Sequence, residues 1–285
     1  MNSHWIPSAV ATILTSAAAT AEAAGAGPVE TVIEVPGYAD FLAVDGTSVW
    51  VTNKGRVERC SKAGKLAEVV MTHPCGAMTI AADTLWVADC EEKTVNRISI
   101  RTAKRTAIMS TGLASPDGEM NVVSGAGSVW VASDKTGLVA RIDPATSTVI
   151  ASVKVEPGSC YLAFGEGAVW VVSAGSQTLQ KIDPATNTAV KTTQLSKAPG
   201  FLAAGEGCVW VQEQGDGTVA RINPATGAVT GRVKVDDTLK WGDIDTGAGK
   251  VWLRTTAGQT FAVIDPLSLA VLARIGPAKR SGALR

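Results

Sequence analysis

The chain has 285 residues, and its 26 Lys and Arg balance 26 Asp and Glu, so the formal net charge is zero. This balance argues against a general nucleic-acid binder or a protein that binds anionic membranes, because both need an excess of basic residues. Only 5% of the residues are aromatic, yet eight of them are Trp. Such a bias toward one residue type suggests an internal repeat.

The N-terminal stretch predicts export. Residues 6–19 are small and apolar, and Ala-Glu-Ala at 21–23 fits the small-x-small pattern of a signal-peptide cleavage site. The alternative is an Ala-rich leader without structure, because no Lys or Arg precedes the apolar run. We predict a signal peptide over 1–23, a linker over 24–28 and one folded domain over 29–285, and we expect an exported protein in the periplasm or outside the cell.

From residue 47 onward, one Trp-centred phrase recurs six times. The copies read TSVWVTNKG, TLWVADCEE, GSVWVASDK, GAVWVVSAG, GCVWVQEQG and GKVWLRTTA. Their central residues are Trp50, Trp86, Trp130, Trp170, Trp210 and Trp252, which stand 36 to 44 residues apart. This spacing is typical of the blades of a β-propeller. We therefore predict an all-β fold with six Trp-bearing units.

The fourth unit shows how one blade divides into strands. We expect strands over 160–165, 168–173, 179–184 and 188–195, which are rich in Val, Ile and Thr. Asp-Pro and Asn-Pro pairs predict the turns between the third and fourth strands. Each Trp lies in the middle of a second strand with apolar neighbours, so we expect it to pack between blades rather than to line an aromatic cage.

The blade count is open at the two ends of the domain. Residues 30–37 match a fourth strand with no blade before it, and residues 274–285 resemble the start of another first strand. Either the propeller has six blades, or it has seven with a shortened last blade and an exposed gap. The two end segments favour the second arrangement.

The repeat, exemplified by VWVASDKTGLVARIDPATSTVIASVKV at 129–155, resembles the YVTN-type propellers and the streptogramin (virginiamycin B) lyase superfamily over residues 29–276. The resemblance implies a propeller fold, and its lyases imply histidines, a glutamate and a magnesium ion. This chain has only two His, and His4 lies in the leader, which leaves His73. The resemblance therefore carries no lyase residue over to this sequence.

The cysteines predict one disulfide. Cys75 and Cys90 lie equally far from a turn near residue 82, so they should face each other across the hairpin between two strands. In an exported protein, such a pair is expected to be oxidised. Cys60 stands where the other units have Ile and should be a small core residue. We expect no metal site, because the sequence has neither a Cys-x-x-Cys motif nor a His cluster.

Candidate binding residues lie on the loops that join fourth to first strands and second to third strands. In propellers these loops share one face and surround one end of the central channel, which we call the channel mouth. Aromatic and charged side chains that converge there would bind a small molecule, a glycan or a peptide. The alternative for each residue is an ordinary solvated position on the rim. The candidates are Trp241, Asp243, Tyr161, Phe201, Glu119, Asp89, Glu213 and Arg254.

We predict a monomeric exported binding module or scaffold, with no catalytic residues, no cofactor and no nucleic-acid partner. The alternative, by analogy with related propellers, is a metal-assisted lyase or lactone hydrolase at the channel mouth. Paired carboxylates, either Asp117 with Glu119 or Asp243 with Asp245, would then bind Ca²⁺ or act as an acid/base pair. Calorimetry with Ca²⁺ and Mg²⁺ would separate the two functions.

Overall fold

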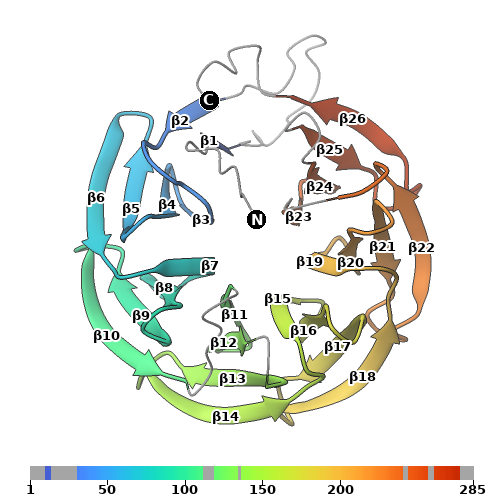
Figure 1. Ribbon diagram of the computed structural model, residues 1–285, viewed down its shortest axis with the longest axis horizontal. Coiled ribbons are helices and arrows are strands. Elements are labelled where there is room, and N and C mark those ends of the chain that lie inside the picture. The colour runs from blue at the N-terminus through green and yellow to red at the C-terminus, as the bar shows by residue number, and fades with distance from the viewer. Residues whose placement is uncertain are drawn as a thin grey trace, which may run out of the picture.

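The computed structural model describes residues 10–13, 31–111, 119–133, 136–239, 243–255 and 260–276. All elements in these ranges are β-strands, and none of these residues forms a helix that could cross a membrane. Six four-stranded antiparallel sheets surround a central channel (Figure 1). In each sheet the first strand lies nearest the channel and the fourth lies on the rim (Figure 1). The fold is therefore a six-bladed β-propeller.

The strands follow the order predicted from the repeat. Blade 1 contains β3 (Leu42–Asp45), β4 (Ser48–Asn53), β5 (Arg56–Ser61) and β6 (Gly64–Val70). Blade 2 contains β7 (Pro74–Ala81), β8 (Thr84–Asp89), β9 (Thr94–Ser99) and β10 (Lys104–Ser110). Blade 3 contains β11 (Asn121–Gly125), β12 (Ser128–Ser133), β13 (Leu138–Asp143) and β14 (Thr148–Lys154).

The remaining blades repeat this layout. Blade 4 contains β15 (Ser159–Gly165), β16 (Ala168–Ser173), β17 (Thr178–Asp183) and β18 (Thr188–Gln194). Blade 5 contains β19 (Pro199–Gly205), β20 (Cys208–Glu213), β21 (Thr218–Ile222) and β22 (Val229–Lys234). Blade 6 contains β23 (Ile244–Gly247), β24 (Lys250–Arg254), β25 (Phe261–Ile264) and β26 (Val271–Ile275).

A two-stranded sheet lies between blade 6 and blade 1, at a place we call the seam (Figure 1). It pairs β1 (Val10–Ile13) with β2 (Thr31–Glu34) in antiparallel register. Ile33 packs with Val49 and Val51 of blade 1, as a fourth strand packs on the next blade elsewhere in the ring. The favoured seven-bladed arrangement is therefore wrong, because in the described residues the seam holds only the two strands β1 and β2 instead of a seventh blade. β1 falls within the predicted signal peptide, which stays a prediction, and cleavage there would remove the partner of β2.

The repeated Trp residues form the core between consecutive blades. Trp50, Trp86, Trp130, Trp170 and Trp210 are at most 1% exposed. Trp210, for example, packs against Ile244, Val251 and Leu253 of the following blade. Burial of one indole removes about 150–250 Å² from water and contributes roughly 4–6 kcal/mol as an upper bound. The prediction of packing between blades is confirmed for these five residues.

In blades 1 to 5, a cation on the third strand joins the blade to the next one. The Arg141 guanidinium lies 4.8 Å from the Trp130 ring centroid and donates a hydrogen bond to Asn187 Oδ1 of blade 4 at 2.8 Å. Lys181 repeats this arrangement over Trp170, at 5.4 Å, and donates to the Pro224 carbonyl oxygen of blade 5 at 2.9 Å. The same strand position donates to the next blade in Arg59, Arg97 and Arg221. We call these five contacts the inter-blade staples.

Blade 6 departs from this pattern on the face that looks toward the seam. Val263 pairs with Trp252, so it stands where the other blades have the Arg or Lys of the staple. Its side chain is uncharged and cannot donate a hydrogen bond to a following blade. Trp252 is only partly buried, in contrast to the five other repeated Trp residues. On the opposite side of the seam, Leu42 and Val44 of blade 1 are 42% and 52% exposed. Among the described residues, the sixth Trp thus has no four-stranded sheet after it to bury it as the other five are buried.

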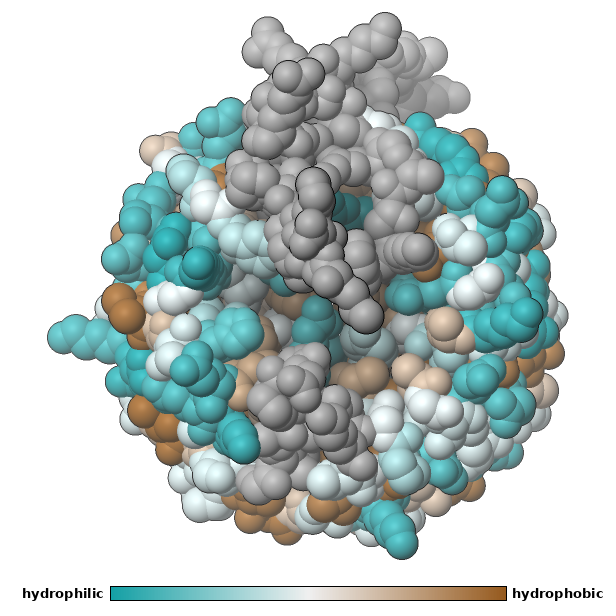
Figure 2. Space-filling view, in the orientation of Figure 1, coloured by the Kyte–Doolittle hydropathy of each residue, from teal (hydrophilic) through white to brown (hydrophobic). Residues whose placement is uncertain are grey.

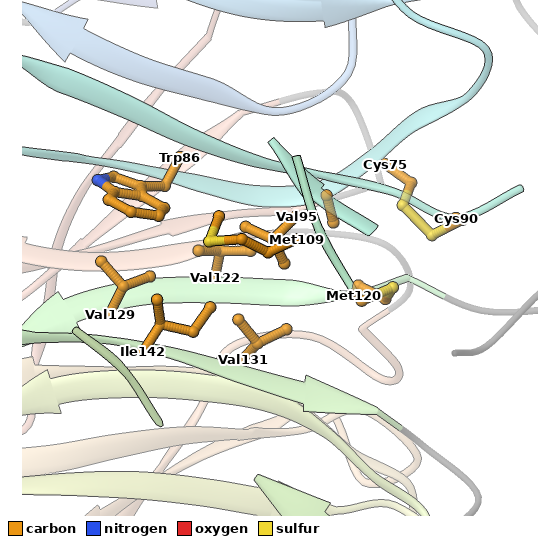
Figure 3. Close-up of a cluster of buried hydrophobic side chains, with 11 residues drawn as sticks. Cys75, Trp86, Cys90, Val95, Met109, Met120, Val122, Val129, Val131 and Ile142 are labelled. Atoms are coloured by element: carbon orange, nitrogen blue, oxygen red, sulfur yellow. A yellow bond between two sulfur atoms is a disulfide. The ribbon is translucent and has the colours of Figure 1, made fainter. Parts of the chain in front are cut away.

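The predicted Cys75–Cys90 disulfide is present, with a Cα–Cα distance of 5.9 Å. The two residues are not directly opposed, because a bulge between Cys75 and Thr79 shifts the register and places Cys75 opposite Ala88. Figure 3 shows the disulfide at one end of a buried cluster between blades 2 and 3, with Trp86 at the other end. Cys60 is 2% exposed, which confirms that it is a core residue.

The bulge also fixes how the disulfide meets blade 3. Gly76 adopts a φ of 70°, in the left-handed region that favours glycine. A Cβ atom at this position would overlap with the backbone of Met120. Met120 is fully buried and lies near the disulfide in Figure 3. The disulfide hairpin therefore packs directly under the segment that leads into β11.

Candidate functional site

The described part of the channel mouth is built by segments from five blades. Tyr38, Asp40 and Phe41 precede the first strand of blade 1, and Glu119 precedes that of blade 3. Tyr161 and Phe201 lie near the starts of β15 and β19. Blade 6 contributes Asp243 just before β23, Asp245 within β23 and Arg254 at the end of β24. Figure 2 shows hydrophilic residues reaching the centre of the ring on the face in view.

Aromatic rings meet across the channel. The ring centroids of Tyr161 and Phe201 lie 4.5 Å apart, and those of Phe41 and Phe201 lie 6.3 Å apart. Blades 1 and 5 are separated by blade 6 and the seam (Figure 1), so the second contact bridges the channel rather than two neighbouring sheets. These three rings provide an apolar surface within the mouth.

Tyr161, Phe201 and Asn121 occupy equivalent places in their blades. Asn121 pairs with Ala132, two residues after Trp130, and Tyr161 pairs with Val172, two residues after Trp170. Phe201 immediately precedes Leu202, which pairs with Val211, as Leu162 pairs with Val171 in blade 4. The three residues therefore point from their first strands toward the following blade at the same level of the channel.

Glu119 is the carboxylate with the most unusual surroundings. Burial, together with the negative charges of Asp40 and Asp243, raises its pKa to about 7. The residue is partly buried, and its Oε2 is a buried oxygen with no hydrogen-bond partner. At neutral pH this carboxyl group is therefore divided between its neutral and charged forms, so it can both hold and release a proton.

Asp243 shares this environment from the opposite side. Its pKa is raised to about 6, mainly by burial and further by Asp245 and Asp40, while the backbone N–H of Ile244 and the charge of Arg254 oppose the rise. The residue is nevertheless exposed to solvent, as expected at the edge of a channel. Burial also raises the pKa of Asp40, which Arg254 counteracts. The Arg254 guanidinium thus counteracts the raised pKa of two of these carboxyl groups, Asp40 and Asp243.

The two tyrosines of the mouth remain neutral donors and acceptors. Burial raises the pKa of Tyr161, and the charge of Glu119 raises it further. Burial and the charges of Asp40 and Glu119 also raise the pKa of Tyr38. Both hydroxyl groups are therefore uncharged at neutral pH, and the negative charge of nearby carboxyl groups acts on both of them.

Two other candidate residues lie inside their blades. The Asp89 carboxylate accepts hydrogen bonds from the backbone N–H groups of Thr72 and His73 at 3.0 and 3.1 Å, and it is 1% exposed. Glu213 is fully buried and is bound by Arg232 at 2.8 Å. Both carboxylates hold neighbouring chain segments in place. A ligand-binding role for them stays a prediction, and Asp117 and Trp241 lie outside the described residues.

Sequence reasoning missed Phe41 and Asn121. A signal for Phe41 was available, because Phe41, Tyr161 and Phe201 each stand immediately before Leu-Ala. Asn121 stands before Val-Val, and only the strand register shows that it is equivalent to the aromatic residues. Alignment of the first strands, rather than of the Trp phrases, would have found this position.

Two further features of the described residues bear on metal and ligand binding. No group of three or more His, Cys, Asp or Glu side chains within them could hold a metal ion. A cleft of about 590 Å³ lies between β2 and strands β5 and β6. Its walls include Arg56 and the buried Glu58, which form an ion pair at 3.1 Å.

Comparisons with known proteins support the fold. No protein-family profile matches the chain, and no curated protein matches it in sequence. Virginiamycin B lyase from Staphylococcus aureus is similar in structure, with a TM-score of 0.65 and 16% identity over 80% of this chain and 82% of that protein. A streptogramin B lyase structure gives a TM-score of 0.71 and 11% identity over 98% and 90%.

A structure of BamB from Moraxella catarrhalis is also similar, with a TM-score of 0.60 and 15% identity over 79% of this chain and 76% of that protein. The predicted resemblance to the streptogramin lyase propellers is thus confirmed as a likeness of structure. At these identities, the likeness establishes the fold alone.

Proposed function

We propose that this protein is an exported β-propeller that binds a small molecule or peptide at its channel mouth. The observation that carries the proposal is the convergence of aromatic rings and carboxyl groups from separate blades. Phe41, Tyr161 and Phe201 supply an apolar surface, and Glu119 and Asp243 supply polar groups with perturbed pKa values. A concave apolar site with a few convergent polar groups is the usual form of a ligand site.

The carboxyl groups support function because they work against stability. Like charges that share a partly buried site destabilise the folded state, as the raised pKa values of Glu119 and Asp243 express. A propeller that served only as a rigid support could carry neutral residues at these places. Such local conflicts between structure and sequence are expected at binding sites.

Export is supported by two observations of different kinds. The Cys75–Cys90 disulfide is a bond that persists in oxidising compartments, and residues 1–23 carry the pattern of a signal peptide. Expression of the full chain in a bacterial host, followed by intact-mass measurement of the periplasmic fraction, tests this part. We expect a mass that begins at residue 24 and contains the disulfide. Full-length protein confined to the cytoplasm would contradict export.

Binding at the mouth can be tested without knowledge of the natural ligand. A fragment library that spans cationic, neutral and anionic compounds would be screened by ligand-observed NMR against the wild type, Tyr161→Ala and Phe201→Ala. We expect the hits to lose at least ~10-fold in affinity in both variants. Val190→Ala is the control, because Val190 is a rim residue and is 52% exposed. Hits that bind all four proteins equally would refute a site at the mouth.

A metal-assisted reaction is tested separately by calorimetry with Ca²⁺ and Mg²⁺. Binding of either ion at micromolar concentration, lost in Asp243→Asn, would replace the proposed binding module by a metal-dependent enzyme. Fragment binding that is insensitive to both ions is the result expected here.

A further inference from the structure

Two polar atoms at the start of β11 are buried without a hydrogen-bond partner. They are Oε2 of Glu119 and Nδ2 of Asn121. Asn121 is only 3% exposed, so water has little access to its amide group. An unsatisfied buried polar group destabilises the folded state, and such groups are uncommon in folded proteins. Two of them in one short segment call for an explanation by a ligand.

The two atoms are complementary, and the spacing of their residues places them on the same side of an extended chain. Residues two apart in an extended segment point in the same direction and are separated by about 6.6 Å along it. Glu119 offers an acceptor, whereas the amide nitrogen of Asn121 is a donor. A single ligand with one donor and one acceptor a few bonds apart could satisfy both atoms.

The surroundings determine the charge and shape of that ligand. Asp40 and Asp243 act on Glu119 with negative charge, which favours a cationic donor. Asn121 occupies the position that Tyr161 has in the next blade, and Tyr161 packs against Phe201 at 4.5 Å. The donor and the acceptor therefore adjoin a surface of aromatic rings, which stabilise both apolar groups and cations.

Building on the function proposed above, we propose that the channel mouth binds an organic ammonium compound with a hydrogen-bond acceptor near its nitrogen and an aromatic or apolar body. The ammonium group donates to Glu119, the acceptor receives a hydrogen bond from Nδ2 of Asn121, and the body packs on Tyr161 and Phe201. Neither polar contact forms a covalent bond or requires a metal ion.

The test uses three related compounds on the full chain. Phenylalaninol carries an ammonium group, a neighbouring hydroxyl acceptor and a benzyl group. Phenethylamine lacks the hydroxyl, and N-acetylphenylalaninol lacks the charge. Affinities would be measured by NMR titration near pH 8, above the Glu119 pKa of about 7. We expect phenylalaninol to bind roughly 5- to 10-fold more tightly than phenethylamine, as one added hydrogen bond predicts, and more tightly still than the neutral compound.

Variants assign each contact to its residue. Asn121→Ala should remove the advantage of phenylalaninol over phenethylamine, and Glu119→Gln should weaken both amines at least ~10-fold while leaving N-acetylphenylalaninol unchanged. Glu91→Gln is the matched control, because it removes the same charge from an exposed position. If Asn121→Ala does not fold, the three compounds on the wild type and Glu119→Gln still test the charge and the acceptor.

The possible failures are distinct. If N-acetylphenylalaninol binds as tightly as phenylalaninol, the ligand class is wrong although a mouth site remains. If no amine binds but other fragments are lost in Tyr161→Ala, the inference fails and the proposed function stands. If no compound depends on Tyr161 or Phe201, both are refuted.

Discussion

The Cys75–Cys90 disulfide supports a test of how the bulged hairpin of blade 2 contributes to stability. Replacement of both residues by Ala removes the covalent link and retains small apolar side chains. Cys90 is fully buried and Cys75 is 8% exposed, so Ala creates a small cavity but no buried hydroxyl group. The double variant therefore reports mainly on the loss of the cross-link.

The expected effect follows from the length of the closed loop. The cysteines are separated by 15 residues in sequence, and a loop of that length restricts the unfolded chain by about 3 kcal/mol. The cavity adds a smaller cost. For a domain of this size, each kcal/mol lowers the melting temperature by about 2–4 °C, so we expect a decrease of roughly 6–12 °C.

Calorimetry or circular dichroism of the wild type, the double variant and the reduced wild type would measure this effect. Cys208→Ala serves as the control, because Cys208 is partly buried and forms no disulfide. A decrease no larger than that of the control would refute the loop-entropy argument. Detection of reactive thiols at Cys75 and Cys90 in the oxidised wild type would refute the disulfide itself.

Three further predictions concern packing, staples and pH. Gly76→Ala should lower the free energy of unfolding by about 2 kcal/mol or more, because its Cβ would overlap with the Met120 backbone at a positive φ; denaturant unfolding measures it, and an unchanged midpoint would contradict the close contact. Arg141→Met should cost about 1–2 kcal/mol through loss of the Asn187 hydrogen bond and the Trp130 contact, and a double-mutant cycle with Asn187→Ala should show coupling rather than additivity. The folded Glu119 keeps a proton that the unfolded chain releases between pH 4.5 and about 7. The free energy of unfolding should therefore fall as pH rises through this range and level off above it. Glu119→Gln should flatten this slope, and an equal slope in both proteins would contradict the raised pKa.

The repeat in the sequence was sufficient to predict the blades but not the surroundings of each one. Trp170 and Trp252 lie in copies of the same repeated phrase, yet the first is 1% exposed and the second only partly buried. The difference arises because the burial of a sheet face depends on its neighbour, which the local sequence does not contain. Val263 at the staple position was the readable sign of this difference, since the other five units have Arg or Lys there.

Variation between the units was a less reliable guide to the site. Asn53, Asp89, Ser173 and Glu213 differ in type because each is buried and binds a different backbone loop. Their divergence follows from loop geometry, which can be mistaken in sequence for functional variation. Glu119 and Asp243 were identified as candidates from their loops, but their mutual effect on pKa depends on the closure of the ring.

The inter-blade staples have a consequence for cooperativity. Each one runs from a blade to its successor, and the seam has Val263 in place of the cation, so energetic coupling resembles that of a linear stack with two ends rather than a closed circle. Blades 1 and 6 should then open first, and hydrogen exchange should be faster in β25 than in the equivalent β17. A circular permutant cut between blades 3 and 4 would leave those two blades joined by the Arg141 staple without a chain connection, whereas blades 6 and 1, where the described residues hold no such staple, have no direct chain connection in the native order.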